Sequence, residues 1–310
     1  MIFIALLIGC VLLYKGGDWL LDGMIGIGES YGLPKAMIGL VLVSVGTSAP
    51  ELFVSLGSAL QDHGGMAAGN VVGSNIINIA IVLGLIVCLS ALAIGRVLQV
   101  QVIAVTLISI VAIVVMSDGS ISRFEGAALM LLMLLSFLFA FSHSARTVES
   151  DSDEGNADID LNENNGRKLI VFVIGGLLAL LVGAESMIWG GLQLAERLGW
   201  SETVVALTVT ALGTSLPEIA ASVVAITRRE FSLALGNVIG SNMLNVGLVL
   251  GLSALIIPLD NIGVDAYTSA YFTGLIVLIL MLSFKPGYLP RIFGYCLLVS
   301  YAVYVGMLLR

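Results

Sequence analysis

Two glutamates lie in matching polar stretches of an otherwise apolar chain. Glu51 ends the sequence GTSAPE and Glu218 ends GTSLPE, with a constant offset of 167 residues and no gap between the copies. The copies continue into GNVVGSNIIN at 69–78 and GNVIGSNMLN at 236–245. Polar segments interrupted by Gly and Pro, at corresponding places in two halves of a chain, are typical of a transporter's binding site.

The side chains that recur beside the two glutamates carry oxygen atoms suited to a cation. They are Thr47, Ser48, Ser74 and Asn78 in the first copy, and Thr214, Ser215, Ser241 and Asn245 in the second. Pro50 has no backbone N–H, so it also frees the carbonyl oxygen of Gly46. Such oxygen atoms are the ligands of hard cations such as Ca²⁺ and Na⁺, and the motifs lack the His and Cys typical of Zn²⁺ or copper sites. Bonding of a hydroxyl to its own helix is the alternative explanation for an isolated Ser or Thr.

The composition places these motifs inside a membrane. Hydrophobic residues make up 58% of the 310 residues and charged residues only 11%, whereas about a quarter of the residues in soluble domains are charged. A carboxylate at the centre of a bilayer costs at least ~2.5 kcal/mol. We therefore interpret Glu51 and Glu218 as functional rather than structural residues.

The lengths of the apolar segments predict an all-α membrane protein. A transmembrane helix needs about 20 residues. Ten segments meet this length, at 2–27, 36–60, 67–92, 97–116, 122–142, 168–195, 203–226, 234–257, 265–284 and 290–309. Their continuous apolar runs exclude a membrane barrel, whose strands alternate. We predict ten transmembrane helices.

One hydrophilic segment, residues 143–167, divides these spans into five and five. Because five is odd, the second half must enter the membrane from the opposite side. This predicts two inverted-topology five-helix repeats, residues 1–142 and 168–310. The segment is acidic, but its spacing does not match a calcium-binding loop. We expect a flexible, solvated linker, with a weak divalent-sensing element as the alternative.

Basic residues predict the orientation in the cell membrane. If the N-terminus is outside, nine lie on the inner side, namely Lys35, Arg96, Arg146, Arg167, Lys168, Arg228, Arg229, Lys285 and Arg291. Only three, Arg123, Arg197 and Arg310, then lie on the outer side. Loops rich in Lys and Arg face the cytoplasm. We therefore expect both termini outside and the 143–167 linker in the cytoplasm.

The paired motifs carry a family resemblance. GTSAPE and GTSLPE, each followed by GNxxGSNxxN, resemble the two α-repeats of the sodium/calcium exchanger family of the cation/calcium antiporter superfamily, in its prokaryotic members. The resemblance covers most of the chain, since ten spans in two inverted halves also match. Related cation/proton exchangers carry GN-x-x-E patterns instead, so Ca²⁺/H⁺ or K⁺-coupled antiport is the alternative.

The resemblance implies that Ca²⁺ is exchanged for Na⁺ by alternating access, at a mid-membrane site between the repeats. Glu51 and Glu218 would be the central ligands, with the recurring hydroxyl and amide residues around them and backbone carbonyls at Ser44 and Ala211. It favours three Na⁺ per Ca²⁺. No prosthetic group, nucleic acid or obligate protein partner is expected; the partners are the transported ions and the lipid bilayer.

A second pair of acids obeys the same offset. Asp18 and Glu185 lie in the first span of each half, where a gating role competes with packing or capping beside the broken helices. Lys15 lies one turn before Asp18, and a local ion pair between them is the simplest expectation.

Two other classes of protein compete with an exchanger. An intramembrane di-acid protease would also use two carboxylates, but its usual GxGD and YD contexts are absent from the sequence. An ion channel normally lines its pore by oligomer symmetry, whereas this chain contains its own two-fold repeat. We therefore predict that the chain is not an enzyme, and dependence of flux on a counter-ion would separate exchanger from channel.

Overall fold

The computed structural model describes residues 2–89, 92–94, 96–148, 163–197, 211–284 and 287–308. The α-helices of the first half are α1 (Ile2–Ser30), α2 (Lys35–Met37), α3 (Ser44–Thr47), α4 (Ala49–Ala59), α5 (Gly64–Ile77), α6 (Gly84–Leu89), α7 (Arg96–Val115) and α8 (Arg123–Val148). Those of the second half are α9 (Glu163–Arg197), α11 (Ala211–Thr214), α12 (Leu216–Thr227), α13 (Phe231–Leu244), α14 (Gly251–Ile256), α15 (Ala266–Ser283) and α16 (Arg291–Leu308). Three π-helical turns, η1 (Ile38–Val43), η2 (Asn78–Leu83) and η5 (Asn245–Leu250), a 3₁₀ turn, η3 (Met116–Asp118), and the strands β1 (Leu92–Ile94) and β2 (Gly287–Leu289) complete the described elements.

The prediction of an all-helical membrane protein is confirmed. Among the described residues, seven helices are long and apolar enough to cross a membrane, or eight when the bent pair Lys35–Thr47 and Ala49–Ala59 is one span. Helices α12 and α15 are shorter apolar helices, and the predicted span 203–226 begins outside the described residues. The count of ten spans stays a prediction.

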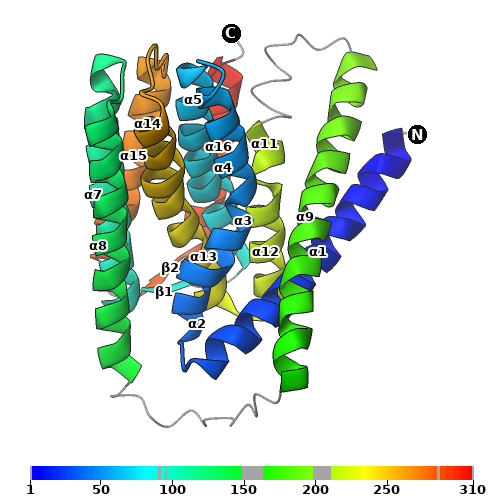
Figure 1. The fold of residues 1–310 in the computed structure, drawn as a ribbon. Helices are drawn as coiled ribbons and strands as arrows, with labels where there is room; N and C mark the ends of the chain where they lie inside the picture. Colours follow the sequence, from blue (N-terminus) through cyan, green and yellow to red (C-terminus); the bar gives the residue numbers. More distant parts are fainter. Residues whose placement is uncertain are drawn as a thin grey trace.

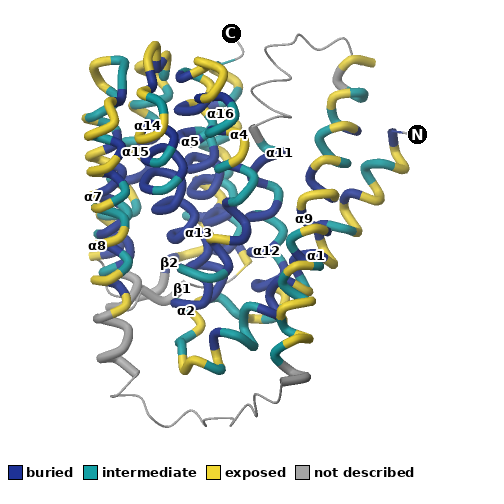
Figure 2. The backbone as a smooth tube through the Cα atoms, viewed as in Figure 1, coloured by how far each residue is buried: buried dark blue, intermediate teal, exposed yellow. Residues whose placement is uncertain are grey.

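The helices differ sharply in burial. In the spans Gly64–Leu89 and Phe231–Ile256, 78% of the most apolar window is buried, against 17% in α8. Figure 2 shows the same contrast, with α5 and α13 dark at the centre and the outer faces of α7, α8, α1 and α9 exposed. Exposed leucines such as Leu131 and Leu138 cover α8, as expected for a helix that faces lipid tails. The two spans that carry the GNxxGSNxxN motifs therefore form the interior.

Local structure repeats with the offset of the motifs. Helix α5 (64–77) and turn η2 (78–83) correspond residue for residue to α13 (231–244) and η5 (245–250). Turns η2 and η5 each begin at the last Asn of a GSNxxN motif, Asn78 or Asn245. Such turns are rare and occur frequently at functional sites. The duplicated sequence is thus a duplicated backbone conformation.

Helices α1 and α9 cross (Figure 1), and glycines lie where they approach each other. A Cβ added at Gly9 would lie 3.0 Å from the carbonyl oxygen of Gly183, and one added at Gly16 would lie 2.9 Å from that of Gly176. Small residues are common where membrane helices approach closely, because they let the backbones touch. Gly9 and Gly176 are equivalent under the 167-residue offset, and so are Gly16 and Gly183. Each contact is thus the repeat counterpart of the other, and a local two-fold relation joins α1 and α9.

Short extended segments join the two halves at two further places. β1 and β2 are antiparallel, with Leu92 opposite Leu289. Ile121 and Leu259 form an isolated antiparallel bridge, with N to O distances of 2.7 and 3.0 Å. Leu92 and Leu259 differ by the motif offset, so the two connections are near equivalents.

The direction of the chain differs between the halves. Figure 1 shows the start of α1 and the end of α16 towards one end of the bundle, and the end of α8 and the start of α9 at the other. In the same view α2 to α4 rise towards the end that holds the termini, whereas α11 to α12 run away from it. Opposed directions of matching helices are what an inverted repeat requires. The division into two five-helix repeats stays a prediction.

Candidate cation site

A break in each span that carries a GTSxPE motif places a glutamate at a helix start. The Lys35–Thr47 and Ala49–Ala59 segments meet at 45°, and Ser48 between them has φ −82° and ψ 6°. Pro50 follows in the first turn of α4 and cannot donate to the carbonyl of Gly46, which accounts for the break. Glu51 lies in that first turn, where the helix dipole favours a negative charge.

The second copy has the same break. Ser215 has φ −88° and ψ 5°, Pro217 lies at the start of α12, and Glu218 is in its first turn. The preceding residues 198–210 lie outside the described part of the chain, so the bend angle of this span is not defined. The GTSxPE sequence therefore produces one local geometry twice.

Each carboxylate is bonded by a hydroxyl of the opposite half. Ser215 donates to Glu51 Oε1 at 3.4 Å, and Ser48 donates to Glu218 Oε1 at 3.1 Å. The two glutamates are 0% and 1% exposed. No Lys or Arg of the described residues forms an ion pair with either of them. Two buried carboxylates without a cationic side chain require charge from elsewhere, because an isolated buried charge is very costly.

Threonine and asparagine bonds add a second reciprocal set. Thr47 donates to Asn237 Oδ1 at 3.2 Å, and Thr214 donates to Asn70 Oδ1 at 3.4 Å. Within each half, the asparagine amide donates to a serine of the neighbouring helix, at 2.9 Å from Asn70 to Ser55 and at 3.1 Å from Asn237 to Ser222. Four spans are thereby held around the glutamates.

Several buried oxygen atoms of the predicted ligands have no hydrogen-bond partner among the described residues. They are Glu51 Oε2, Glu218 Oε2, Ser74 Oγ, Asn78 Oδ1 and Asn245 Oδ1. A buried polar atom left without a partner costs about 1–3 kcal/mol. A hard cation would satisfy such a set, because Ca²⁺ binds several oxygens of carboxylate and amide groups.

The remaining predicted ligands differ in what they do. Ser241 is buried and lies 3.5 Å from Thr47 between hydroxyl oxygens. The Ser44 hydroxyl donates to the carbonyl oxygen of Leu40 in its own span, at 2.5 Å. This is the alternative to cation binding that was considered for an isolated hydroxyl. The Ser44 backbone carbonyl accepts the Ser48 N–H at 2.9 Å, and the Thr47 hydroxyl also donates to it, at 3.4 Å. Ala211 begins α11, and its side chain lies outside the described residues.

Two further asparagines join the network and are absent from the predicted set. Asn75 accepts a hydrogen bond from Asn245 at 3.1 Å and donates to the backbone oxygen of Asn242 at 3.4 Å. Both are at most 2% exposed. The signal was present in the sequence, since both are the Asn of a GSN triplet and differ by the motif offset.

Asp18 does not pair with Lys15, which corrects the expected local ion pair. Arg228 at the end of α12 binds Asp18, and its Nη1 lies 2.6 Å from Asp22 Oδ1. Lys15 instead lies 5.9 Å from the ring centre of Tyr14. The long Arg228 side chain crosses from the second half to α1, whereas Lys15 points elsewhere on the same helix.

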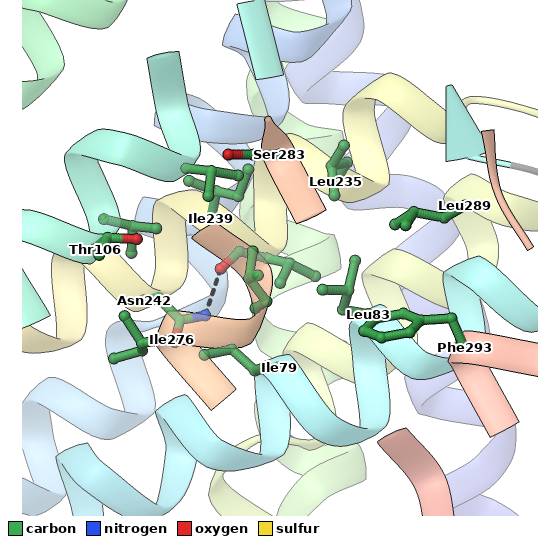
Figure 3. A pocket seen from close by; sticks show the side chains of 14 residues that line it. Ile79, Leu83, Thr106, Leu235, Ile239, Asn242, Ile276, Ser283, Leu289 and Phe293 are labelled. Atoms are coloured by element: carbon green, nitrogen blue, oxygen red, sulfur yellow. Dashed lines mark hydrogen bonds between the residues drawn. The ribbon is translucent and has the colours of Figure 1, made fainter. Parts of the chain in front are cut away.

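A cavity of about 50 Å³ has a lining that includes neither Glu51 nor Glu218. Figure 3 shows aliphatic side chains such as Leu83 and Ile239 around it, and its polar lining residues are Thr106, Asn242 and Ser283. A lining that is mostly aliphatic and holds no carboxylate is a poor match for a hard cation. The candidate cation site is therefore the oxygen cluster at Glu51 and Glu218.

Comparisons with known proteins agree with this chemistry. The sodium/calcium exchanger protein family model matches residues 1–142 and 168–310. The sodium/calcium exchanger MaX1 of Methanosarcina acetivorans is 32% identical, over 99% of this chain and 98% of its own. The inner membrane protein YrbG of Escherichia coli is 33% identical, over 98% and 95%. The solved structure of the sodium-calcium exchanger NCX_Mj soaked with Na⁺ and Sr²⁺ is 29% identical, with a TM-score of 0.83 over 99% of both chains. The chain belongs to the sodium/calcium exchanger family.

Proposed function

We propose that this protein exchanges Ca²⁺ for Na⁺ across the cell membrane by alternating access. The observation that carries the proposal is the pair of buried glutamates, each bonded by a serine of the other half. A site built from both halves changes its access when one half moves relative to the other, as in transporters with inverted repeats. The similarity to MaX1 and NCX_Mj, which are both sodium/calcium exchangers, supports the same pair of ions.

The proposed ligand set keeps the roles inferred from the sequence. Glu51 and Glu218 bind the cation directly, and the amide oxygens of Asn78 and Asn245 approach it from the π-helical turns. Hydroxyls complete the set at Thr47, Ser48, Ser74, Thr214, Ser215 and Ser241, with backbone carbonyls at Ser44 and Ala211. Two carboxylates balance one Ca²⁺ or two Na⁺, so competition between the ions follows from charge.

A Ca²⁺/H⁺ antiporter is the second candidate. The observation that favours it is that neither glutamate has a cationic side-chain partner among the described residues. A buried carboxylate without such a partner becomes neutral by binding either a metal ion or a proton. Protons could therefore take the place of Na⁺ in the return half of the cycle.

Calcium uptake into proteoliposomes separates the candidates. Vesicles are preloaded with Na⁺, with K⁺ or with acidic buffer, and radioactive Ca²⁺ is added outside. We expect rapid uptake only with internal Na⁺, since Na⁺ leaving the vesicle drives Ca²⁺ in. Uptake driven by internal acid alone would replace the sodium proposal with the proton one, and uptake without any counter-ion would indicate a channel.

A further inference from the structure

Asn75, on α5 of the first half, contacts two residues of the second half. Its amide nitrogen lies 3.4 Å from the backbone oxygen of Asn242, and its amide oxygen lies 3.1 Å from the amide nitrogen of Asn245. Asn75 and Asn245 are both 0% exposed. Solvent therefore does not compete for these bonds, and the side chain has a fixed pair of neighbours.

The two contacts determine which way each amide faces. A backbone carbonyl oxygen only accepts hydrogen bonds, so Asn242 O must face the NH₂ group of Asn75. The Asn75 oxygen then faces Asn245, and an oxygen can bond only to the NH₂ group of that amide. The Asn245 oxygen is consequently turned away from Asn75, and it has no partner among the described residues.

The freed Asn245 oxygen is one of the unpartnered atoms of the candidate cation site. Amide oxygens are ligands for hard cations, whereas an amide NH₂ group repels them. A flip of Asn245 would present the wrong end of the amide to the ion. Asn75 touches no carboxylate in the described hydrogen bonds, so its effect on the ion passes through Asn245.

The equivalent contact is missing in the other direction. Asn242, the repeat counterpart of Asn75, donates to Val238 O of its own helix at 2.7 Å, and Figure 3 shows this bond at the cavity edge. Its oxygen has no partner, and neither atom of the Asn78 amide has one. The structure thus contains one oriented amide and one amide without such a support.

We propose that Asn75 is a positioning residue that presents the Asn245 amide oxygen to the transported cation across the boundary between the halves. The inference deepens the proposed function and rests on its cation site. Residues that orient a metal ligand typically change metal affinity by about 10–100-fold when they are lost. Loss of the Asn75 contact to Asn245 should therefore lower the apparent affinity for Ca²⁺.

The first test replaces Asn75 by Leu, which has a similar size but no hydrogen-bonding atoms. We expect Asn75→Leu to raise the KM for Ca²⁺ uptake on the order of tenfold with little change in kcat. Asn75→Asp restores an acceptor for the Asn245 NH₂ group and should recover most of the affinity. Asn242→Leu is the matched control, and a smaller effect is expected because Asn242 does not hold Asn78 here.

The second test separates orientation from packing. An Asp at position 245 has two oxygen atoms and no NH₂ group, so it needs no orientation. Asn75→Leu should therefore change the KM by less than about twofold, or lower it, when combined with Asn245→Asp. An equal loss of affinity in both backgrounds would show that Asn75 acts only by packing and would overturn the proposal.

A binding measurement keeps this test distinct from that of the exchange reaction. The Ca²⁺-induced rise in melting temperature of the detergent-solubilised protein is recorded for the same four proteins: the parent, both single variants and the double variant. If uptake fails but this rise depends on Asn75 only when Asn245 is present, the exchange proposal is wrong and the positioning proposal stands. If the Ca²⁺-induced rise in melting temperature is the same with and without Asn75→Leu in both backgrounds, the positioning proposal is overturned. A parent protein that shows no rise overturns it as well. If Asn75→Leu does not fold, Asn75→Ser is used instead, because the shorter serine side chain ends farther from Asn245.

Discussion

The two halves of the chain share their central contacts but differ at the edges. The serine bonds to Glu51 and Glu218 are reciprocal, and so are the threonine bonds to Asn70 and Asn237. The Asn75 bond to Asn245 has no equivalent in the opposite direction. The duplicated motifs therefore produce equivalent contacts at the glutamates and unequal contacts at the asparagines of the GSN triplets.

A larger difference lies at the helix ends. Arg228 binds Asp18 and Asp22 on α1, and Lys35 lies 2.5 Å from Glu230. The residue that corresponds to Arg228 under the offset is Gln61, which bonds to a carbonyl of its own helix. Among the described residues, the ion pairs of Arg228 therefore have no counterpart at Gln61.

The largest expected effect tests whether the halves contribute equally. Glu51→Gln and Glu218→Gln should each abolish Ca²⁺ exchange, because each removes half of the negative charge at the site. Uptake by reconstituted protein measures this, and Glu29→Gln, at an exposed position of α1, is the control. Exchange that survives one of the two substitutions would show that the halves are not equivalent at the centre.

The orientation of the halves has an all-or-none test. A protease site inserted in the 149–163 segment should be cut from the cytoplasmic side and protected from outside, since basic residues cluster on the side of that segment. Cleavage is followed by blotting of intact cells and of inverted vesicles. Cleavage by external protease would mean that the predicted orientation is reversed, with the linker outside and the termini in the cytoplasm.

Charge counting predicts voltage dependence. Each half supplies one carboxylate, so three Na⁺ leave one net positive charge whereas one Ca²⁺ is balanced. One charge crossing the membrane changes the driving force by about 2.3 kcal/mol per 100 mV. Na⁺-driven Ca²⁺ uptake under a potential set by K⁺ and valinomycin should therefore change several-fold. A rate independent of voltage, with two Na⁺ counted per Ca²⁺, contradicts this stoichiometry.

Aspartate at the two π-turn asparagines compares the halves more finely. Asn78→Asp and Asn245→Asp each add a negative charge and should strengthen Na⁺ binding. The gain should be larger at Asn78, because a new carboxylate at 245 would face the Asn75 oxygen. Na⁺ inhibition of Ca²⁺ uptake measures the difference, and an equal gain in the two variants would argue that the Asn75 contact has no influence on the ion.

The smallest expected effect concerns the charged end. Arg228→Gln introduces the residue found at the corresponding position 61 and removes two partly exposed ion pairs. We expect a loss of about 1 kcal/mol in the free energy of unfolding, measured as a lower melting temperature in detergent. Arg229→Gln is the control, since Arg229 is exposed and forms no ion pair with a described residue. Similar losses in both variants would remove any special role for Arg228.

Much of this molecule follows from local sequence. Apolar length predicts helices such as α1, whose bounds, Ile2–Ser30, are close to the expected 2–27. Pro50 and Pro217 predict the breaks that place Glu51 and Glu218 at helix starts, because proline removes a helix hydrogen bond wherever it occurs. The 167-residue offset predicts that these features recur together.

Contacts between the halves depend on how the helices meet in three dimensions. Lys15 lies nearest to Asp18 along the chain, yet Arg228 binds it, because α12 brings a distant side chain against α1. Asn75 and Asn242 occupy the same position of the two GSNxxN motifs, yet only Asn75 bonds to the asparagine of the facing turn. The duplicated motifs supply the residues of the proposed site. The packing of α5 against η5 selects which amide is oriented, since one sequence pattern is compatible with either arrangement.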